Sequence, residues 1–448
     1  MSSNRNMGTH TQIGFMNQAR SLIRVSLVTL ACVAPWSAAL ASADLSKLDW
    51  QSTVRLAETN NPELHVAREN KTSAEAKKRV AYATFLPTVR GTIGYESTER
   101  SGTSNVPVTT GTGWTAGLQG NWNLFAGFGD HAKLEQAEAD LAAAESSLQQ
   151  ARAKISQELK VAFEASVYAR DSAKLSSQIL KRREENYRLV QLRFESGREN
   201  KGSVLLSEAY LEQARYDDLQ AKNSVRTSSA ALGKLLGLDE ADFEKLEVVG
   251  NVPTSTPPDS RPDLQKIAER TPDYLIAKAQ AENAEHAKRV SRAAFLPSLD
   301  LSASLNKRGD DFFPNTTGTQ SVGISLSIPL FTGGKNLYGF QSAAALASAA
   351  DSQRDNVLRE QRRKVEAAWS TFVESTFKLK ADESFQKASV VRAEIARTRY
   401  NNGLLSFEDW DVIENDLITR QRAFLTAKKD RVAAEAAWEQ VQGVGVWK

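Results

Sequence analysis

The stretch that decides the fold is DHAKLEQAEADLAAAESSLQQARAKI, residues 130–155, in which every seventh position from 134 to 155 is leucine or isoleucine. Apolar residues at this spacing are typical of helices that pack as coiled coils. From residue 130 the chain contains neither glycine nor proline until Gly197. Because an α-helix rises 1.5 Å per residue, the pattern predicts one helix over residues 130–198 with a length of roughly 100 Å.

A second long helix of the same kind is predicted over residues 335–401. Each long helix ends at a short polar bend, residues 197–203 or 402–406, and a shorter helix, 204–238 or 407–442, is predicted to return along it. Alanine dominates the seams of these helices, which permits close helix packing and argues against a wide hydrophobic core. The sequence therefore predicts two long helical hairpins.

Four segments alternate apolar and polar residues with a period of two, which predicts strands over residues 87–96, 114–124, 297–305 and 321–331. Each has about ten residues, which matches the ~9–11 that a tilted strand needs to cross a bilayer. Four strands cannot close into a barrel, because bacterial outer-membrane barrels have at least ~8 strands. An open sheet edge in hydrocarbon would also leave backbone N–H and C=O groups without hydrogen bonds. Several chains must then contribute, and three would give twelve strands.

Aromatic residues fall near the ends of these strands, where the interfacial girdles of a membrane barrel would lie. The predicted membrane-interface aromatics are Phe85, Trp114, Trp122, Phe125, Phe295 and Phe331. The alternative is a soluble protein whose four strands form an ordinary half-buried sheet against helices. That alternative places no demand on aromatic residues at the strand ends.

The chain repeats itself once. Residues 83–87, ATFLP, recur as AAFLP at 293–297, and a charged, alanine-rich helix is predicted before each, over 58–83 and 273–294. Elements around the strand ends and the hairpin bends recur in the same order. The sequence thus predicts two structural copies.

The predicted domain boundaries follow from this repeat. The first copy covers residues 44–238 and the second covers 264–448, with the proline-rich connector 239–263 between them. Residues 1–43 have the features of an export signal, with cleavage after Ala41 or, preferably, Ala43. A membrane anchor is the alternative for this segment, whose apolar run is shorter than the ~20 residues of a spanning helix.

Composition excludes several classes of function. The chain has 57 Lys and Arg against 54 Asp and Glu, a formal charge of +3, and its only cysteine lies in the signal segment. A nearly neutral chain offers no bulk attraction to nucleic acid, and basic runs such as residues 181–183 are interpreted as solvated helix faces. The histidines are far apart, so we expect no catalytic residue, metal site or cofactor, and no enzyme.

The doubled F-L-P elements at Phe85 and Phe295, the L-F-x-G elements at Leu124 and Leu330, and the RYNNG sequence from Arg399 are similar to signatures of the TolC family of outer membrane factors. The resemblance covers essentially the whole mature chain. It implies a homotrimer whose twelve strands form one β-barrel in the outer-membrane lipid. Its helices would form a tapering periplasmic tunnel that docks on an adaptor protein and an inner-membrane pump of the RND or ABC type.

The function implied by this resemblance is that of a passive exit duct in a tripartite export system, for efflux of small molecules, drugs or metals. A channel for type I protein secretion is an alternative, because the same duct can serve both cargoes. A periplasmic coiled-coil scaffold without a pore is an alternative of another class.

The acidic cluster after the second bend is the candidate periplasmic gate. Glu408, Asp409 and Asp411 lie within about two helical turns, and a threefold ring of carboxylates favours cations over anions. By resemblance, Asp409 occupies the place of the family's constriction aspartate, whereas Val412 stands where a second acid is usual. The alternative is that these acids stabilise the start of a helix capped by Ser406.

The residues of the two bends are, by the same resemblance, candidates for contact with the adaptor: Gly197, Arg198, Gly403 and Leu404. Their alternative role is turn formation, which glycine alone explains.

Overall fold

The computed structural model describes residues 47–100, 109–258, 260–316 and 318–447. These residues belong to one unit, Asp44–Lys448. The predicted signal segment, residues 1–43, lies outside the described residues.

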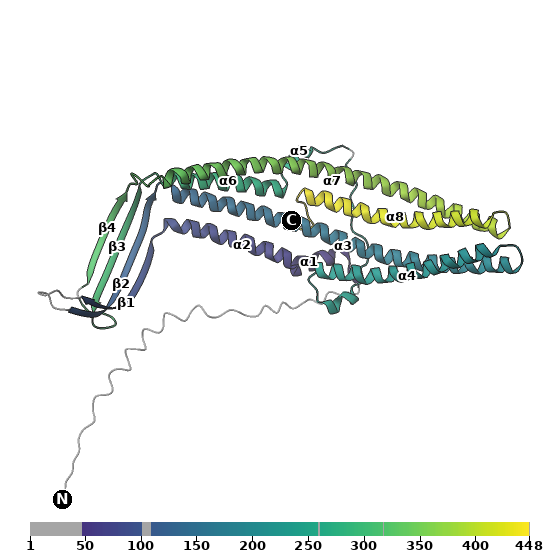
Figure 1. The fold of residues 1–448 in the computed structure, drawn as a ribbon, viewed down its shortest axis with the longest axis horizontal. Coiled ribbons are helices and arrows are strands. Elements are labelled where there is room, and N and C mark those ends of the chain that lie inside the picture. The colour runs from purple at the N-terminus through teal and green to yellow at the C-terminus, as the bar shows by residue number, and fades with distance from the viewer. Residues whose placement is uncertain (1–46, 101–108, 259, 317, 448) are drawn as a thin grey trace, which may run out of the picture. The chain divides into compact units, whose positions relative to one another are not determined.

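Long α-helices and one antiparallel sheet make up this unit, as the sequence predicts (Figure 1). The helices are α1 (Trp50–Asn60), α2 (Pro62–Tyr82), α3 (Gly129–Glu195), α4 (Lys201–Leu235), α5 (Leu264–Ala268), α6 (Pro272–Ala293), α7 (Lys335–Asn401) and α8 (Phe407–Val441). The strands are β1 (Thr88–Arg100), β2 (Thr109–Ala126), β3 (Ser298–Gly309) and β4 (Thr319–Ser327). Two short 3₁₀ helices, η2 (Ala83–Phe85) and η3 (Glu240–Lys245), complete it.

The helices form a row in which α3 is central. Near the sheet, α3 contacts α2 and α6, and α6 contacts α7. Toward the hairpin bends, α3 contacts α4 and α8, and α8 contacts α7. Since α3 and α7 have 67 residues each, both run for roughly 100 Å. No helix in the described part of the chain is both long and apolar enough to cross a membrane.

Several element ends differ from the prediction for local reasons. Strands β1 and β2 pair as far as Arg100 and Thr109, beyond the predicted ends, because ladder hydrogen bonds do not require apolar side chains. Strand β4 begins two residues earlier than predicted and ends at Ser327, four residues early, before Pro329, which has no N–H for a ladder bond. Strand β3 begins at Ser298, after Pro297, and extends four residues further than predicted.

Helix ends also shift. α3 ends at Glu195, before the left-handed Gly197, and α4 begins at Lys201 because the Asn200 side chain caps it. The first predicted helix, 58–83, is two helices, since Asn61 is extended and caps α2 at Pro62.

The main core lies where α1, α3, α4 and the connector meet. Phe163 and Leu159 of α3 are fully buried there beside Leu232 of α4. Trp50 packs edge-on against Phe163, with ring centroids 5.6 Å apart. Trp447 joins the same cluster and donates a hydrogen bond to the Val54 carbonyl at 3.3 Å. This core fixes the middle of the helical row.

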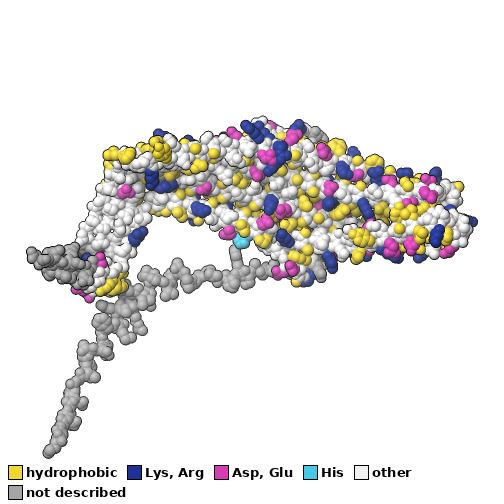
Figure 2. All heavy atoms as spheres, in the orientation of Figure 1, with side chains coloured by type: hydrophobic (Ala, Val, Ile, Leu, Met, Phe, Trp, Pro, Cys, Tyr) yellow, Lys and Arg dark blue, Asp and Glu magenta, His cyan; other side chains and the backbone are white. Residues whose placement is uncertain are grey.

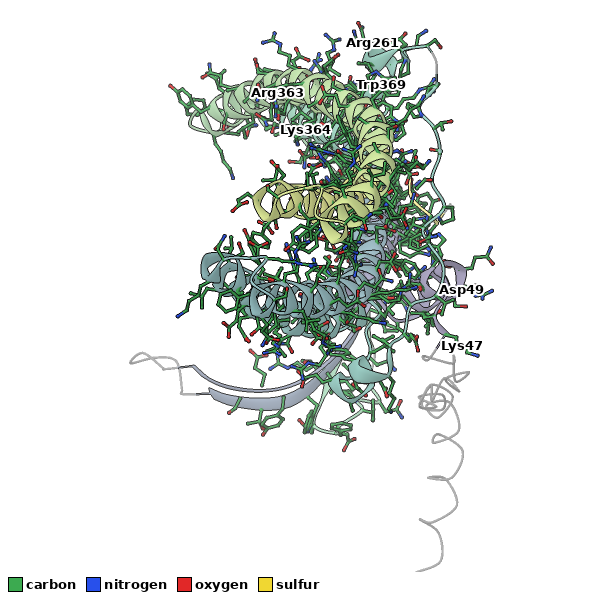
Figure 3. All side chains as sticks on the ribbon, turned by 90° about the vertical axis from the view of Figure 1, so that its right-hand side faces the viewer. Lys47, Asp49, Arg261, Arg363, Lys364 and Trp369 are labelled. Atoms are coloured by element: carbon green, nitrogen blue, oxygen red, sulfur yellow. The ribbon has the colours of Figure 1, made fainter. Side chains whose placement is uncertain are left out.

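The connector passes from this core to α7. Its Ser255 donates from both N and Oγ to the Glu435 carboxylate of α8, at 2.7 Å each. Further along, Arg261 forms an ion pair with Glu366 of α7. Figure 3 looks along the helices and shows Arg261 and Trp369 of α7 on the same side of the molecule. The connector is therefore fastened to both helices of the second hairpin.

The sheet has strand order β1-β2-β3-β4 and one apolar and one polar face. On one face, Trp122 pairs with Leu301, which pairs with Ile324. On the other, Gln119 pairs with Ser304, which pairs with Ser321. Strands β1 and β4 are the edges, and every residue of β4 is exposed. Among the described residues nothing pairs with either edge.

Candidate functional site at the hairpin bends

The two bends share one backbone geometry. Gly197 and Gly403 have φ values of +70° and +75°, which a side chain would strain. The residues that follow close equivalent loops: Arg198 N donates to the Arg193 carbonyl at 2.8 Å, and Leu404 N donates to the Arg399 carbonyl at 2.9 Å. This is the Schellman pattern of helix ends, so the glycines of both bends have a turn-forming role.

An aromatic cluster joins the two hairpins just above the bends. Tyr400 of α7 stacks on Trp410 of α8 with ring centroids 4.3 Å apart, and both are buried beside Val190 of α3. The Arg193 guanidinium lies 4.4 Å over the Tyr400 ring and donates to the Tyr400 carbonyl. The Tyr400 hydroxyl donates to Glu199 at 3.0 Å. Both hairpins are thereby held together in this structure.

Tyr400 stays neutral in this setting. Burial raises the pKa of its hydroxyl above the usual value, and the hydrogen bond that the hydroxyl donates to the Glu199 carboxylate raises the pKa further. The hydroxyl is therefore a fixed hydrogen-bond donor between the hairpins.

Farther from the bends than this aromatic cluster, ion pairs join α3 and α8. Arg182 holds Glu414 with two hydrogen bonds, Nε to Oε2 at 2.7 Å and Nη2 to Oε1 at 2.8 Å. The side chain of Glu414 is 1% exposed and that of Arg182 is 29% exposed. We call this pair the α3–α8 latch. A bidentate pair of this geometry fixes the position of one helix against the other.

Arg183 forms a second contact to α8. Its Nη1 lies 3.5 Å from Asp411 Oδ1, and its guanidinium lies 4.6 Å over the Tyr210 ring of α4. Burial raises the pKa of Asp411, and the nearby Arg183 charge offsets part of that rise. Asn415 donates to Asp411 Oδ2 at 3.0 Å. Three helices thus meet at one polar network.

The structure places the three predicted gate acids in three different settings. Asp409 is exposed in the first turn of α8 and is bonded to the N-cap residue Ser406: Ser406 Oγ accepts from Asp409 N at 3.1 Å and donates to Asp409 Oδ2 at 2.9 Å. The expected cap at Ser406 is confirmed. Glu408 is exposed, whereas Asp411 points into the network with Arg183. The acids therefore do not form one cluster.

The interpretation of residues 181–183 as a solvated face was wrong for two of them. Arg183 is 7% exposed and Arg182 is bound to Glu414. Position 183 continues the seven-residue series that starts at 134, which is the signal that it faces another helix. A basic residue on a coiled-coil seam indicates an acidic partner, and the sequence alone did not identify Glu414 as that partner.

The predicted aromatic residues lie at both ends of the sheet. At the end far from the helices, Trp114 contacts Tyr95 at 5.0 Å and Phe312 at 4.8 Å between ring centroids. Trp122 lies eight residues away on β2, about 26 Å at ~3.3 Å per residue. The apolar band of outer-membrane barrels is about 25 Å tall.

Aromatic residues at the helix end of the sheet are held by specific contacts. Trp122 Nε1 donates to the Phe85 carbonyl at 2.9 Å, and Phe125 packs edge-on against Phe128 at 5.1 Å. Phe295 faces Phe340 at 6.4 Å, and Phe331 is 88% exposed. Figure 2 shows hydrophobic side chains gathered at this junction and again at the opposite end of the sheet.

Two long helical hairpins, fastened to each other near their bends and carrying a two-faced sheet between aromatic ends, define the class of outer-membrane channel proteins. The model of the outer membrane efflux protein family matches residues 53–238 and 264–444. The chain belongs to this family, and the resemblance inferred from the sequence is confirmed.

Relatives of known name agree with this placement. The chain is 27% identical to the alkaline protease secretion protein AprF of Pseudomonas aeruginosa over 51% of its length, and spans about half (49%) of that protein. It is 23% identical to the outer membrane efflux protein BepC of Brucella suis, over 84% of this chain and 81% of BepC.

Solved structures share the fold. The outer membrane protein VceC of Vibrio cholerae superposes with a TM-score of 0.78 at 21% identity, over 88% of this chain and 96% of that one. The open state of the MtrE outer membrane channel of Neisseria gonorrhoeae gives 0.73 at 20% identity, over 90% and 89%.

Proposed function

We propose that three copies of this chain form one channel through the outer membrane and the periplasm, and that the channel is the passive exit duct of a tripartite export system. The observation that carries the proposal is the two-faced sheet with two unpaired edges. An apolar face with open edges is stable in lipid only if the edges are paired.

The strand directions suit closure by identical copies. Because all four strands are antiparallel neighbours in the order β1 to β4, β4 runs opposite to β1. A second copy can therefore place its β1 beside β4 and continue the antiparallel alternation. Three copies give the twelve strands expected from the sequence, with Ser, Asn and Gln on the inner face.

The two sides of the helical row are also unpaired. One side carries exposed apolar residues on α2 and α4, among them Val80 and Tyr216, and α7 on the other side carries Phe377 and Ile395. The two surfaces differ, so contact between them is heterologous and generates a ring when the rotation closes. The same rotation that joins the strands would join the helices into a tunnel.

The gate of the duct is assigned to the bends and to α8. The α3–α8 latch and the stacked Tyr400 and Trp410 hold α8 against the first hairpin. Opening requires α8 to leave α3, which breaks these contacts. Glu408 and Asp409 are exposed at the start of α8, and their carboxylates would attract cations to the entrance.

The binding site for the adaptor protein is proposed to be the cleft between the two bends. A hollow of about 420 Å³ lies there and is lined by both hairpins, including Arg198 and Gly403. Leu404 beside it is 74% exposed. An exposed apolar side chain next to a polar cleft suits the tip of another helical hairpin. The inner-membrane pump would act through that adaptor.

Efflux of small molecules is the main function proposed, and protein secretion is a second candidate because AprF is named for the secretion of a protease. The test is the purified protein in planar bilayers and on a gel without boiling. A channel proposal expects stable conductance steps and a heat-modifiable trimer, whereas a soluble monomer without conductance would support a periplasmic scaffold.

Cargo is tested separately. The chain is expressed together with candidate adaptor and pump pairs in a strain that lacks its own outer-membrane channels. Restored resistance to small toxic compounds indicates efflux, and an exported protein substrate in the medium indicates secretion.

A further inference from the structure

Glu164 is a buried acid that the proposed gate does not use. It lies near the middle of α3, is 2% exposed, and its Oε2 is buried with no hydrogen-bond partner in the described part of the chain. The residues one turn before and one turn after it contact α8: Lys160 pairs with Glu439, and the Lys429 ammonium lies 4.9 Å over the Tyr168 ring. A buried carboxylate without a partner is costly, so this position requires an explanation.

The charged groups that face Glu164 are already engaged elsewhere. On α8, Lys428 donates to the Asn251 side chain of the connector at 3.1 Å. On α3, Arg170 donates to its neighbour Asp171 at 3.1 Å and to the Val248 carbonyl at 2.9 Å. None of these bonds goes to Glu164.

Other charged residues of α3 and α8 are held in ion pairs. Lys160 of α3 binds Glu439 of α8 at 2.5 Å, and Arg431 binds Glu435 within α8 at 2.6 Å. Glu164 is therefore a lone carboxyl one helical turn from the satisfied Lys160–Glu439 ion pair.

The protonation state follows from this setting. Burial is the main cause that raises the pKa of Glu164 to about 7, with a smaller contribution from the Asp171 charge, while Lys428 and Arg170 lower it. The carboxyl therefore changes charge near neutral pH, where an exposed glutamate is ionised throughout.

We propose that Glu164 is a proton-operated switch in the packing of α3 against α8. In its neutral form the two helices pack as they do here, and in its ionised form the carboxylate draws water into the contact and loosens it. This inference rests on the proposed function, because loosening α8 from α3 is the movement assigned to opening of the duct.

The sign of the effect follows from linkage. The packed state binds the proton more tightly than the open or unfolded state, in which the carboxyl has its ordinary pKa near 4.5. The packing of α3 against α8 is therefore strongest below about pH 4.5 and weakens as pH rises toward 7. Above pH 7 the full effect of the charge is present and no further change is expected from this group.

The test is hydrogen–deuterium exchange of α3 and α8 in the purified full-length assembly between pH 5 and 8, with each rate divided by the intrinsic rate at that pH. For the native protein, the opening equilibrium should rise by up to about tenfold per pH unit per subunit below pH 7, and then level off. Glu164→Gln should abolish this rise. Glu158→Gln, an acid on the same helix whose side chain is 37% exposed, is the matched control and should retain it.

A second variant keeps the test valid if Glu164→Gln does not fold. Lys428→Met removes a charge that lowers the pKa of Glu164, so the transition should move to higher pH. The proposal is overturned if native protein and Glu164→Gln show the same pH dependence, or if Lys428→Met leaves the midpoint in place. Because exchange is measured without transport, a pH-dependent contact in a protein that forms no channel would refute the proposed function alone.

Discussion

The α3–α8 latch gives the sharpest prediction from the packing. Substitution of Arg182 by methionine removes both hydrogen bonds to Glu414 and leaves its carboxylate 1% exposed without a counter-charge. Breaking a buried pair by removal of one partner typically costs 3–5 kcal/mol. Because Arg182 retains 29% exposure, water can reach the site and the lower end applies, about 3 kcal/mol per subunit or a factor of roughly 150.

The assay combines thermal unfolding with single-channel recording. Arg182→Met should lower the midpoint of unfolding and raise the fraction of time spent in high-conductance states. The double variant Arg182→Met with Glu414→Leu replaces the pair by apolar groups of similar size and should recover most of the stability. Arg392→Met is the control, since its contact to Asp416 is at 3.6 Å with a side chain 60% exposed, which is expected to contribute little.

The reasoning is refuted if Arg182→Met behaves like Arg392→Met, because the latch would then contribute nothing. It is also refuted if the double variant is as unstable as the single one, since the loss would then not come from an unpaired carboxylate.

Three further predictions concern single positions. Gly237→Ala should destabilise the chain by more than about 2 kcal/mol in thermal unfolding, because its φ is +63° and an added Cβ would lie 2.4 Å from the Asn60 carbonyl oxygen; Gly197→Ala, with φ +70° and free space, should cost only about 1 kcal/mol. An equal loss for both would show that the contact at Asn60 is unimportant. Ser406→Ala removes the cap of α8 and should cost about 1 kcal/mol and increase hydrogen exchange at Phe407 to Asp409, a pattern that unchanged exchange would contradict. Asp409→Ala should raise single-channel conductance and weaken block by divalent cations, and unchanged recordings would remove Asp409 from the gate.

The sequence predicts the helices well because their signals are local. The seven-residue series of α3 and the absence of glycine before Gly197 define a long helix without knowledge of its neighbours. Strand ends are less well predicted, since β1 and β2 stay paired through polar residues as far as Arg100 and Thr109, where pairing, and not hydrophobicity, sets the limit.

The site was harder to predict because it depends on pairing between distant segments. Arg182 and Glu414 are 232 residues apart in the sequence, and no local pattern identifies one as the partner of the other. The family resemblance predicts Asp409 as a gate residue from its position after a bend, and the same position places it in the first turn of α8, where it bonds to the cap residue Ser406. Only the register between α3 and α8 distinguishes Glu414, which is buried, from Glu408, which is exposed.

The number of chains in the assembly is the most direct test of the account. Native mass spectrometry of protein extracted from the outer membrane in detergent should give a mass of three mature chains, because in the proposed channel the edges of β1 and β4 are paired by other copies. A stable single chain in the membrane fraction would contradict a shared barrel.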